Sequence, residues 1–182
     1  NPDGGPSAAP TGCGESAPGY PAPCLMSVQV TPTCVEDVPE VSYNVLGTAP
    51  NVLNKSFTIT ADIEVPQGSG NGMLVTQGGR FGGWGFYLLK GKPVFVYDLL
   101  DLERPRVEGS AALTPGKHKV EFAFKSDGPG LGKGGTGTIT IDGAEAGSGT
   151  FPHTIPFALE ASETFDIGSD TGTGVNDADY QT

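Results

Sequence analysis

Alternating apolar and polar positions in the middle of the chain are the clearest structural signal in the sequence. From Ser56 to Val65 every second residue, beginning at Phe57, is apolar, and the residues between them are polar. Because successive side chains of a β-strand point to opposite faces, this period of two predicts a strand with one buried face. The segment from Lys117 to Lys125 alternates in the same way. Its predicted inward side chains are His118, Val120, Phe122 and Phe124.

Shorter segments carry further strand signals, and turn residues separate them. The predicted strands span 73–77, 84–89, 93–99, 136–142, 155–159 and 164–167. Residues 93–99 are apolar at both parities, which predicts a central position. Asp142-Gly143 is a strong signal for a type I′ hairpin turn. Many short strands without a credible helix indicate an all-β fold, an antiparallel jelly-roll-like β-sandwich.

The N-terminal part of the chain has a different character. The first 50 residues contain nine of the sixteen prolines, a composition typical of extended chain. We therefore expect a Pro/Gly-rich, acidic arm over residues 1–47 and a sandwich domain over residues 48–182. Within the arm only Ser27 to Thr31 alternates as a short strand, with Val28 and Val30 on one face.

Composition and charge exclude several classes of function. The net charge is −11, and all ten Lys and Arg residues lie between Lys55 and Lys133 without forming a cluster. Nucleic acid is therefore not an expected partner, because phosphate binding needs clustered positive charge. No run of 18 apolar residues exists that could cross a bilayer. The chain begins at Asn1 without an initiator Met or a signal peptide, as expected of a mature end or a fragment end.

The order of short motifs along residues 48–182 resembles a known module. The motifs begin at Lys55 (KSFTITAD), Gln77 (QGGRFGGWGFYL), Gly91 (GKPVFVY), Gly116 (GKH), Gly130 (GLGKGG) and Phe165 (FDIGSDTG). In this order and spacing they look like the C-terminal β-sandwich of bacterial arylsulfatases, which in turn is similar to the laminin-G and concanavalin-type jelly roll. The resemblance implies an accessory domain outside the cytoplasm, periplasmic or secreted.

Two features depart from that family. Its catalytic segment, Cys-x-Pro-x-Arg, provides the residue that becomes formylglycine, and neither Cys13, Cys24 nor Cys34 is followed by that pattern. The module also normally continues into a further strand with an aromatic-x-Gly-x-Ile pattern, which this chain lacks. We therefore expect no catalytic sulfatase domain, and a sandwich without its closing strand.

The three cysteines lie in the predicted arm, ten or eleven residues apart. An odd count without a Cys-x-x-Cys pair argues against a structural zinc site. An exported compartment would favour one disulfide and one spare thiol, and the pairing among Cys13, Cys24 and Cys34 stays open.

Candidate catalytic groups are few. His118 has inward parity, which is more typical of a satisfied core or rim histidine than of a catalytic base, and His153 lies in a turn. No Ser occupies a Gly-x-Ser-x-Gly elbow, and no cysteine has a histidine nearby in sequence. We expect no enzymatic activity and no cofactor, calcium excepted.

Two segments are candidates for ligand binding. The acidic C-terminal segment offers oxygen ligands for calcium, although its spacing is not that of an EF-hand. The proposed metal ligands are Asp166, Asp170, Asp177 and Asp179. The glycine-rich run 78–85 is typical of tight turns that let strands pass closely, and its alternative role is a platform for sugar rings. The candidate ligand contacts are Arg80, Phe81 and Trp84, with Tyr87 beyond them.

These observations favour a non-catalytic accessory module that docks on a protein partner or a larger extracytoplasmic assembly. A sandwich that lacks a strand exposes an edge, and we expect the N-terminal arm or a neighbouring polypeptide to occupy it. The alternatives are a carbohydrate-binding module, with or without calcium, and a C-terminal piece of an arylsulfatase.

Overall fold

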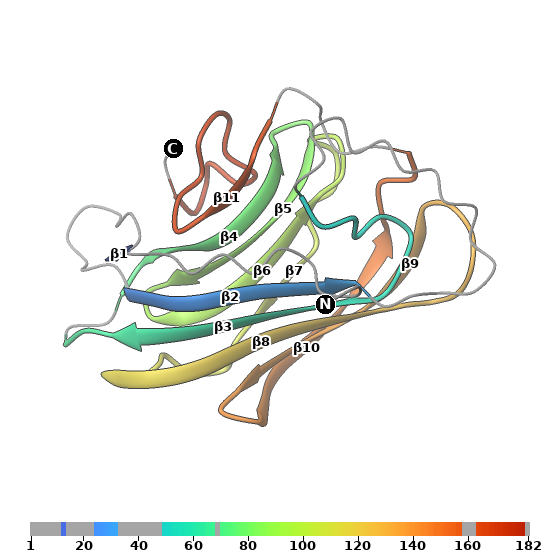
Figure 1. Cartoon of the computed structure of the whole chain (residues 1–182). Helices are drawn as coiled ribbons and strands as arrows, with labels where there is room; N and C mark the ends of the chain where they lie inside the picture. The colour runs from blue at the N-terminus through green and yellow to red at the C-terminus, as the bar shows by residue number, and fades with distance from the viewer. Residues whose placement is uncertain (1–11, 14–23, 33–48, 68–69, 158–162, 181–182) are drawn as a thin grey trace.

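The computed structural model describes residues 12–13, 24–32, 49–67, 70–157 and 163–180, and these residues form two antiparallel β-sheets that face each other (Figure 1). The six-stranded sheet has the order β1 (Gly12–Cys13), β2 (Cys24–Pro32), β3 (Phe57–Val65), β8 (Gly116–Ser126), β9 (Lys133–Ile141) and β10 (Ala144–His153). The five-stranded sheet has the order β11 (Phe165–Ile167), β4 (Gly72–Gly79), β5 (Gly82–Leu89), β6 (Lys92–Asp98) and β7 (Arg106–Glu108). The predicted antiparallel β-sandwich is thereby confirmed. Within the described part of the chain, no helix is long and apolar enough to cross a membrane.

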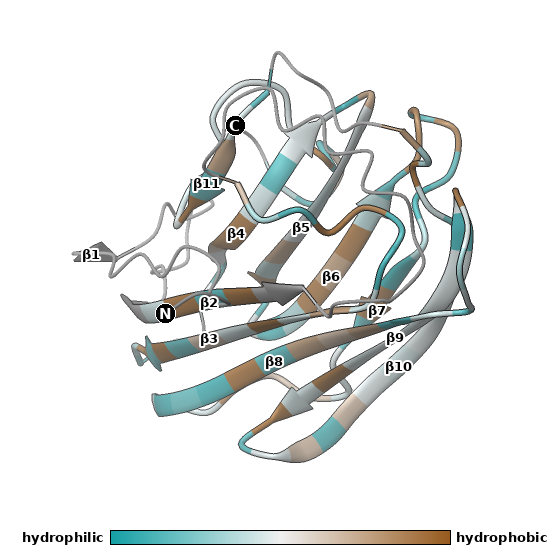
Figure 2. Cartoon of the chain, turned by 45° about the vertical axis from the view of Figure 1, so that its right-hand side comes forward, coloured by the Kyte–Doolittle hydropathy of each residue, from teal (hydrophilic) through white to brown (hydrophobic). Residues whose placement is uncertain are grey.

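The six-stranded sheet buries one face, as the alternation in its strands predicts. In β3 the residues from Phe57 to Val65 that share the parity of Phe57 are all buried, and those between them are partly or fully exposed. The strand β8 repeats this pattern, and its register places Phe57 opposite Phe124. Bands of brown alternate with teal or white along these strands (Figure 2).

The strand predicted in the N-terminal region is confirmed and belongs to this sheet. β2 pairs antiparallel with β3, with Val28 opposite Ala61 and Val30 opposite Ile59. Both valines are buried in the core between the sheets, whereas Gln29 is exposed. The edge of β3 is therefore occupied by a segment of the predicted arm.

The five-stranded sheet is buried on both faces over β4, β5 and β6. The inward side chains Trp84, Phe86 and Phe95 join the main core. The outward side chains form a second apolar cluster with residues of the C-terminal segment 163–180, which lies over this face (Figure 1). That cluster contains Met73, Tyr87, Val94, Val96 and Val175, with Leu89 and Tyr180 packed against it. The double burial explains why 93–99 is apolar at both parities. The predicted central position is confirmed only as an interior one, because β6 lies between β5 and the edge strand β7.

Aromatic rings fill the space between the sheets. Phe95 of β6 and Phe122 of β8 stack with centroids 3.6 Å apart and planes 7° apart. Phe57 is tilted against this pair, Phe151 meets it edge-on, and Trp84 stacks against Phe95 with planes 20° apart. The core therefore joins strands that lie up to about half the chain apart in sequence.

One side of the sandwich is closed by two strands that sequence patterning missed. β10 carries small residues, and only Phe151 among its side chains is buried. A Cβ at Gly147 would overlap the carbonyl oxygen of Glu108, the last residue of β7. The small residues that weaken the alternation are thus what allows β10 and β7 to approach. The strand predicted at 155–159 is wrong over its described residues, 155–157, which follow β10 without strand pairing.

The tight turns follow the sequence. Asp142 and Gly143 have φ of 52° and 84°, which confirms the predicted turn between β9 and β10. Gly78 lies opposite Gly83, and a side chain at Gly78 would overlap the backbone of Gly82. The glycine-rich run therefore allows β4 and β5 to pass closely.

Candidate functional site

The outer side of β2 is the edge of the six-stranded sheet along most of its length. Toward the inside, β2 pairs with β3 from Cys24 to Pro32. Toward the outside, β1 pairs only with Cys24 and Leu25. Among the described residues no strand pairs with the outer side of 27–32. We call residues 27–32 the β2 edge.

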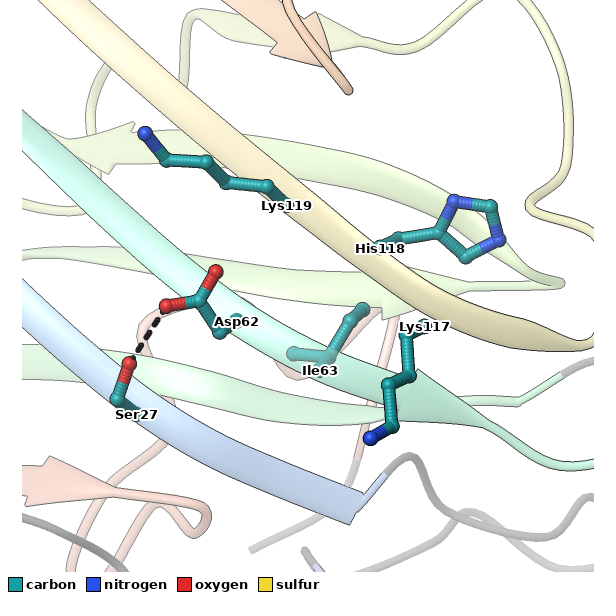
Figure 3. Close-up of a pocket in the computed structure, with 6 residues that line it drawn as sticks. All are labelled: Ser27, Asp62, Ile63, Lys117, His118 and Lys119. Atoms are coloured by element: carbon teal, nitrogen blue, oxygen red, sulfur yellow. Dashed lines mark hydrogen bonds between the residues drawn. The ribbon is translucent and has the colours of Figure 1, made fainter.

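A polar pocket lies on the outer face of the sheet beside this edge (Figure 3). Ser27, Asp62, Ile63, Lys117, His118 and Lys119 line it. Ser27 donates a hydrogen bond to Oδ2 of Asp62 at 2.8 Å, which joins β2 to β3. Lys119 forms an ion pair with Glu121 at 3.3 Å. The pocket therefore combines a hydroxyl group and a carboxylate with two ammonium groups at the end of β8.

His118 at this pocket is satisfied by structural partners. Its Nδ1 lies 2.7 Å from Oδ2 of Asp142, and its Nε2 lies 2.9 Å from the carbonyl oxygen of Thr114. Desolvation lowers the pKa of His118, but the bonds to Asp142 and Thr114 outweigh it and raise the pKa above its ordinary value. The predicted rim histidine is confirmed, since both nitrogens are engaged at the end of β8.

The proposed calcium ligands are distributed over separate local networks. Oδ2 of Asp166 accepts hydrogen bonds from Thr164 and from Thr171, at 2.6–2.8 Å. Oδ2 of Asp170 accepts from the Tyr180 hydroxyl at 2.6 Å and from the Val175 amide at 3.4 Å. Burial raises the pKa of Asp170, and its Oδ1 is buried without a partner among the described residues.

The other two carboxylates point to arginines. Asp177 lies 3.7 Å from Arg80, and Asp179 accepts from Arg106 at 2.9 Å and from the Tyr87 hydroxyl at 2.6 Å. Burial, with the bond to Asp179, raises the pKa of Tyr87. The four aspartates thus do not converge on one point, and the described residues contain no group of three or more His, Cys, Asp or Glu side chains arranged to hold a metal.

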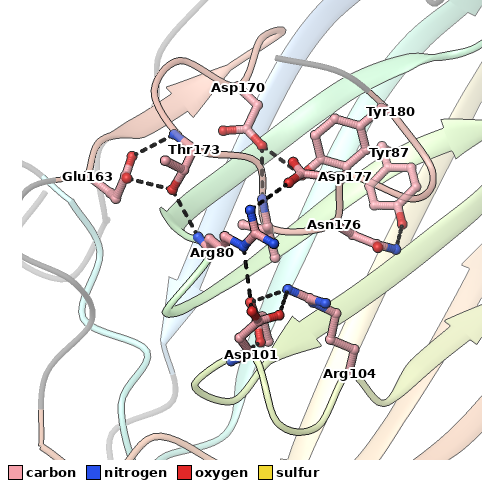
Figure 4. A network of polar contacts seen from close by, with 12 residues as sticks. Arg80, Tyr87, Asp101, Arg104, Glu163, Asp170, Thr173, Asn176, Asp177 and Tyr180 are labelled. Carbon is pink, nitrogen blue, oxygen red and sulfur yellow. Dashed lines mark hydrogen bonds and ion pairs between the residues drawn. The ribbon is translucent and has the colours of Figure 1, made fainter.

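Only part of the proposed sugar platform reaches the surface. Arg80 is half-exposed and lies between Asp101 and Asp177 (Figure 4). Phe81, the next residue in the chain, is 57% exposed. The candidate role of Trp84 as a ligand contact is wrong. Its side chain is fully buried against Phe57 and Phe95, because its parity on β5 faces the core. Tyr87 is likewise buried under the C-terminal segment. Neither ring offers a face to a ligand.

No motif in the sequence marks the pocket beside β2. The outward parity of Lys117 and Lys119 was visible in the alternation, and so was that of Asp62. Their meeting with Ser27 depends on the pairing of β2 with β3 and of β3 with β8, which no local pattern specifies. Of the cysteines, Cys13 and Cys24 are register partners on β1 and β2, and Cys34 lies outside the described residues.

Comparisons with known proteins return one structural likeness. No family model matches the sequence, and no curated protein matches it. Among solved structures, domains LG4-5 of the mouse laminin α1 chain match 84% of this chain with 20% identity and a TM-score of 0.48. The match covers 37% of that laminin chain, so this chain spans well under two thirds of its length.

Proposed function

We propose that this chain is a non-catalytic interaction module, and that a protein partner adds a strand to the β2 edge. The single observation that supports this is the one-sided pairing of β2 among the described residues, where β2 pairs from Cys24 to Pro32 with β3 and at only two residues with β1. Unpaired N–H and C=O groups along a strand are a template for another strand, and proteins use this mode to bind extended peptides.

The pocket beside the edge gives this contact a source of specificity. In strand addition the main-chain bonds supply affinity, and side chains that alternate along the added strand are sorted by pockets next to it. Lys117 has no hydrogen bond or ion pair with another described residue, whereas Lys119 is paired with Glu121. The register sets Lys117 opposite Glu64 and Cys24, at the level where β1 pairs, whereas Asp62 lies opposite Ser27 at the start of the β2 edge. A side chain of the partner strand beside Ser27 would therefore meet the carboxylate of Asp62, and a hydrogen-bond donor there would complement it.

Charge placed at the edge tests the proposal. Lysine on an edge strand is a device that proteins use against strand addition. The exposed Gln29 is changed to Lys in one variant of the full chain, and the exposed Thr136 of β9, which is not an edge strand, is changed to Lys as the matched control. The chains are expressed with an affinity tag in the cell that makes the protein, cross-linked there and purified.

Gln29→Lys should abolish the cross-linked protein adducts and Thr136→Lys should retain them, with both variants melting as the wild type does. Asp62→Ala should weaken the same adducts. Equal adducts from all four chains would contradict strand addition at the β2 edge.

A carbohydrate-binding module, with or without calcium, is the second candidate. The observation in its favour is that Phe81 offers an exposed ring beside Arg80, Asp101 and Asp177. A ring with neighbouring polar groups is suited to stack on a sugar while the polar groups bind its hydroxyls. Binding to an immobilised glycan array that Phe81→Ala abolishes would favour this candidate over strand addition.

The calcium part of this candidate has its own test. Calcium that binds the folded state alone raises the melting temperature. If Asp166, Asp170, Asp177 and Asp179 rearrange around calcium, millimolar calcium should raise the melting temperature of the wild type and not that of Asp170→Ala. An unchanged melting temperature in the wild type would remove calcium from this candidate.

A third candidate is a C-terminal piece of an arylsulfatase, and it rests on the resemblance of residues 48–182 to that family's sandwich. The formylglycine motif is missing from this chain, so we expect no turnover of an aryl sulfate or aryl ester. Turnover that a point substitution in this chain abolishes would contradict the non-catalytic role. An extracytoplasmic location, which the same resemblance implies, can be tested by fractionating the cells that make the protein.

A further inference from the structure

The large apolar side chains that are exposed among the described residues lie on loops, and none lies on a strand. They are Phe81, Leu100, Leu102, Leu131 and Phe157. Leu102 is 81% exposed and Phe157 is 65% exposed. Single exposed apolar residues are common on protein surfaces, but a gathering of them marks an interaction site. We call these five residues the apolar loop cluster.

Contacts between the loops place the cluster at one end of the sandwich. Nε of Arg80, next to Phe81, lies 3.5 Å from Oδ2 of Asp101, which is between the two leucines of the β6–β7 loop. A Cβ at Gly82 would lie 2.9 Å from Cδ1 of Ile155, so the β4–β5 turn touches the segment that leads to Phe157. His153 of the same segment lies 3.2 Å from Glu103 of the β6–β7 loop.

The fifth residue joins the same end through Asn54. The amide group of its side chain donates to the carbonyl oxygen of Pro156 at 2.7 Å, and its Oδ1 accepts from the Gly132 amide at 2.7 Å. Leu131, which precedes Gly132, is therefore held beside the segment that carries Phe157. The opposite end of the sandwich, at the Asp142-Gly143 turn, contributes no member of the cluster.

The loop that carries Leu100 and Leu102 is held by buried polar contacts. Asp98 is fully buried, and its Oδ1 accepts from the Asp101 amide at 3.0 Å while its Oδ2 pairs with Arg104 at 3.3 Å. Leu99 accepts from the amides of Leu102 and Glu103. The exposed leucines are thus presented by a braced turn, so little conformational entropy is lost when a partner covers them.

We propose that the apolar loop cluster is a second docking surface, and that it binds a protein partner whose surface offers apolar pockets bordered by Lys or Arg. The charge around the cluster selects this occupant. Around Phe81, Leu100 and Leu102 the three exposed carboxylates are those of Asp101, Glu103 and Asp177. They face the guanidinium group of Arg80, while the charge of Arg104 is balanced by the buried Asp98. An anionic bilayer would be repelled by this excess of acid, whereas a basic rim on a protein would be attracted.

This inference rests on the proposed role as an interaction module, but it is independent of the β2 edge. The cluster consists of side chains on loops, and strand addition uses the backbone of residues 27–32. Variants of one surface therefore leave the other intact.

Site-specific photo-cross-linking in the cell that makes the protein tests the proposal. The photoreactive residue p-benzoylphenylalanine is placed at position 102 or 81 of the full chain, and as the control at the exposed position 144 beside the Asp142-Gly143 turn. Each chain is also made with Leu100→Ser and Phe157→Ser together. Purified wild-type chain is mixed separately with vesicles of phosphatidylglycerol and phosphatidylcholine.

We expect a protein adduct of one defined mass from positions 102 and 81, at least tenfold weaker from position 144 and from the doubly substituted chain. Gln29→Lys should leave this adduct in place. Adducts of equal strength from position 144, no protein adduct at all, an adduct with a second copy of this chain, or vesicle binding that the double substitution abolishes would each overturn the proposal. Loss of the adduct in Gln29→Lys alone would show that the apolar loop cluster binds only when the β2 edge is engaged, and would overturn the claim that the two surfaces act independently.

Discussion

The two sheets of this sandwich bury their inner faces in the same way and treat their outer faces differently. On the six-stranded sheet the outward positions of β3 and β8 are polar except for Ala123, and all of them are partly or fully exposed. On the five-stranded sheet Val94, Val96 and Tyr87 face outward and are buried beneath the C-terminal segment. A strand that alternates therefore has one packed face, and a strand that is apolar throughout has a second layer over it.

The two ends of the chain cause this difference. The N-terminal segment adds β2 beside β3, which widens one sheet and leaves its outer face open. The C-terminal segment adds only the short β11 beside β4 and then crosses the outer face of the other sheet, where Val175 and Tyr180 pack. One end therefore contributes an edge that a partner can extend, and the other contributes a cover.

Removal of the N-terminal end should have the largest effect on this arrangement. Deletion of residues 1–45 takes away β2, with the buried Val28 and Val30, and exposes the edge of β3. Full burial of a valine is worth about 1.5–3 kcal/mol, so we expect the free energy of unfolding to fall by about 3–6 kcal/mol. Urea denaturation measures this difference. A deletion of residues 1–11, which keeps β1 and β2, serves as the control, and an unchanged midpoint for the longer deletion would show that β2 contributes little to the core.

A charge placed on the outer face of each sheet should separate the two faces. Val96 of β6 and Ala123 of β8 both face outward from interior strands, but Val96 is buried and Ala123 is exposed. Val96→Lys places an unpaired ammonium group under the C-terminal segment and should destabilise the fold by about 3–5 kcal/mol. Ala123→Lys should change stability by less than about 0.5 kcal/mol.

Thermal and urea unfolding of the two variants measure this contrast. Similar losses in both would mean that the outer face of the six-stranded sheet is also covered. Similar tolerance in both would mean that the C-terminal segment does not hold its position over Val96.

How far the sequence predicts this fold depends on how local each signal is. β3 and β8 were predictable because a single packed face imposes an alternation that ten residues display. β10 was not predictable, because the close approach of β7 requires glycine at Gly147 and Gly149. This contact joins segments about 40 residues apart in sequence. The same holds for Trp84, whose assignment to the surface failed because parity on a glycine-rich strand does not say which face meets the core.

The surfaces proposed for binding were predictable only in part. The short alternation in 27–31 led to a strand that could occupy an edge, and β2 lies at that place. The pocket joins Ser27, Asp62 and Lys117 from three strands through their register, which sequence alone does not contain. The apolar loop cluster joins loops from four connections, and each of its members looks like an isolated apolar residue along the chain.

A disulfide between Cys13 and Cys24 would link β1 covalently to β2 and so stabilise the N-terminal edge of the six-stranded sheet. These residues are opposed on antiparallel neighbours, where Cα atoms lie about 4.5–5.5 Å apart, inside the range that a disulfide spans. In an oxidising compartment we expect this pair to form and Cys34 to stay a thiol. Reduction should lower stability by about 2–4 kcal/mol. Peptide mapping under non-reducing conditions identifies the pair, and a Cys24–Cys34 linkage would contradict the register of β1 and β2.

The smallest effect that we predict is a dependence of the melting temperature on pH, caused by His118 near the start of β8. Both nitrogens of His118 face acceptors, Asp142 and the Thr114 carbonyl, so the imidazolium donates to both and the neutral ring to only one. The pKa of His118 is raised in the folded state, and the bond to the Lys119 amide, with that to His118, lowers the pKa of Asp142. Because the folded pKa lies above the unfolded one, the stabilisation is complete below the unfolded pKa and is lost as pH rises through the folded pKa.

The melting temperature of the wild type should therefore fall as pH rises from about 6 to 8, relative to His118→Gln. Asp142→Asn, which removes the carboxylate and keeps the ring, should flatten the profile as well. A wild-type profile parallel to that of His118→Gln would show that the hairpin turn and β8 are not joined by a charged histidine.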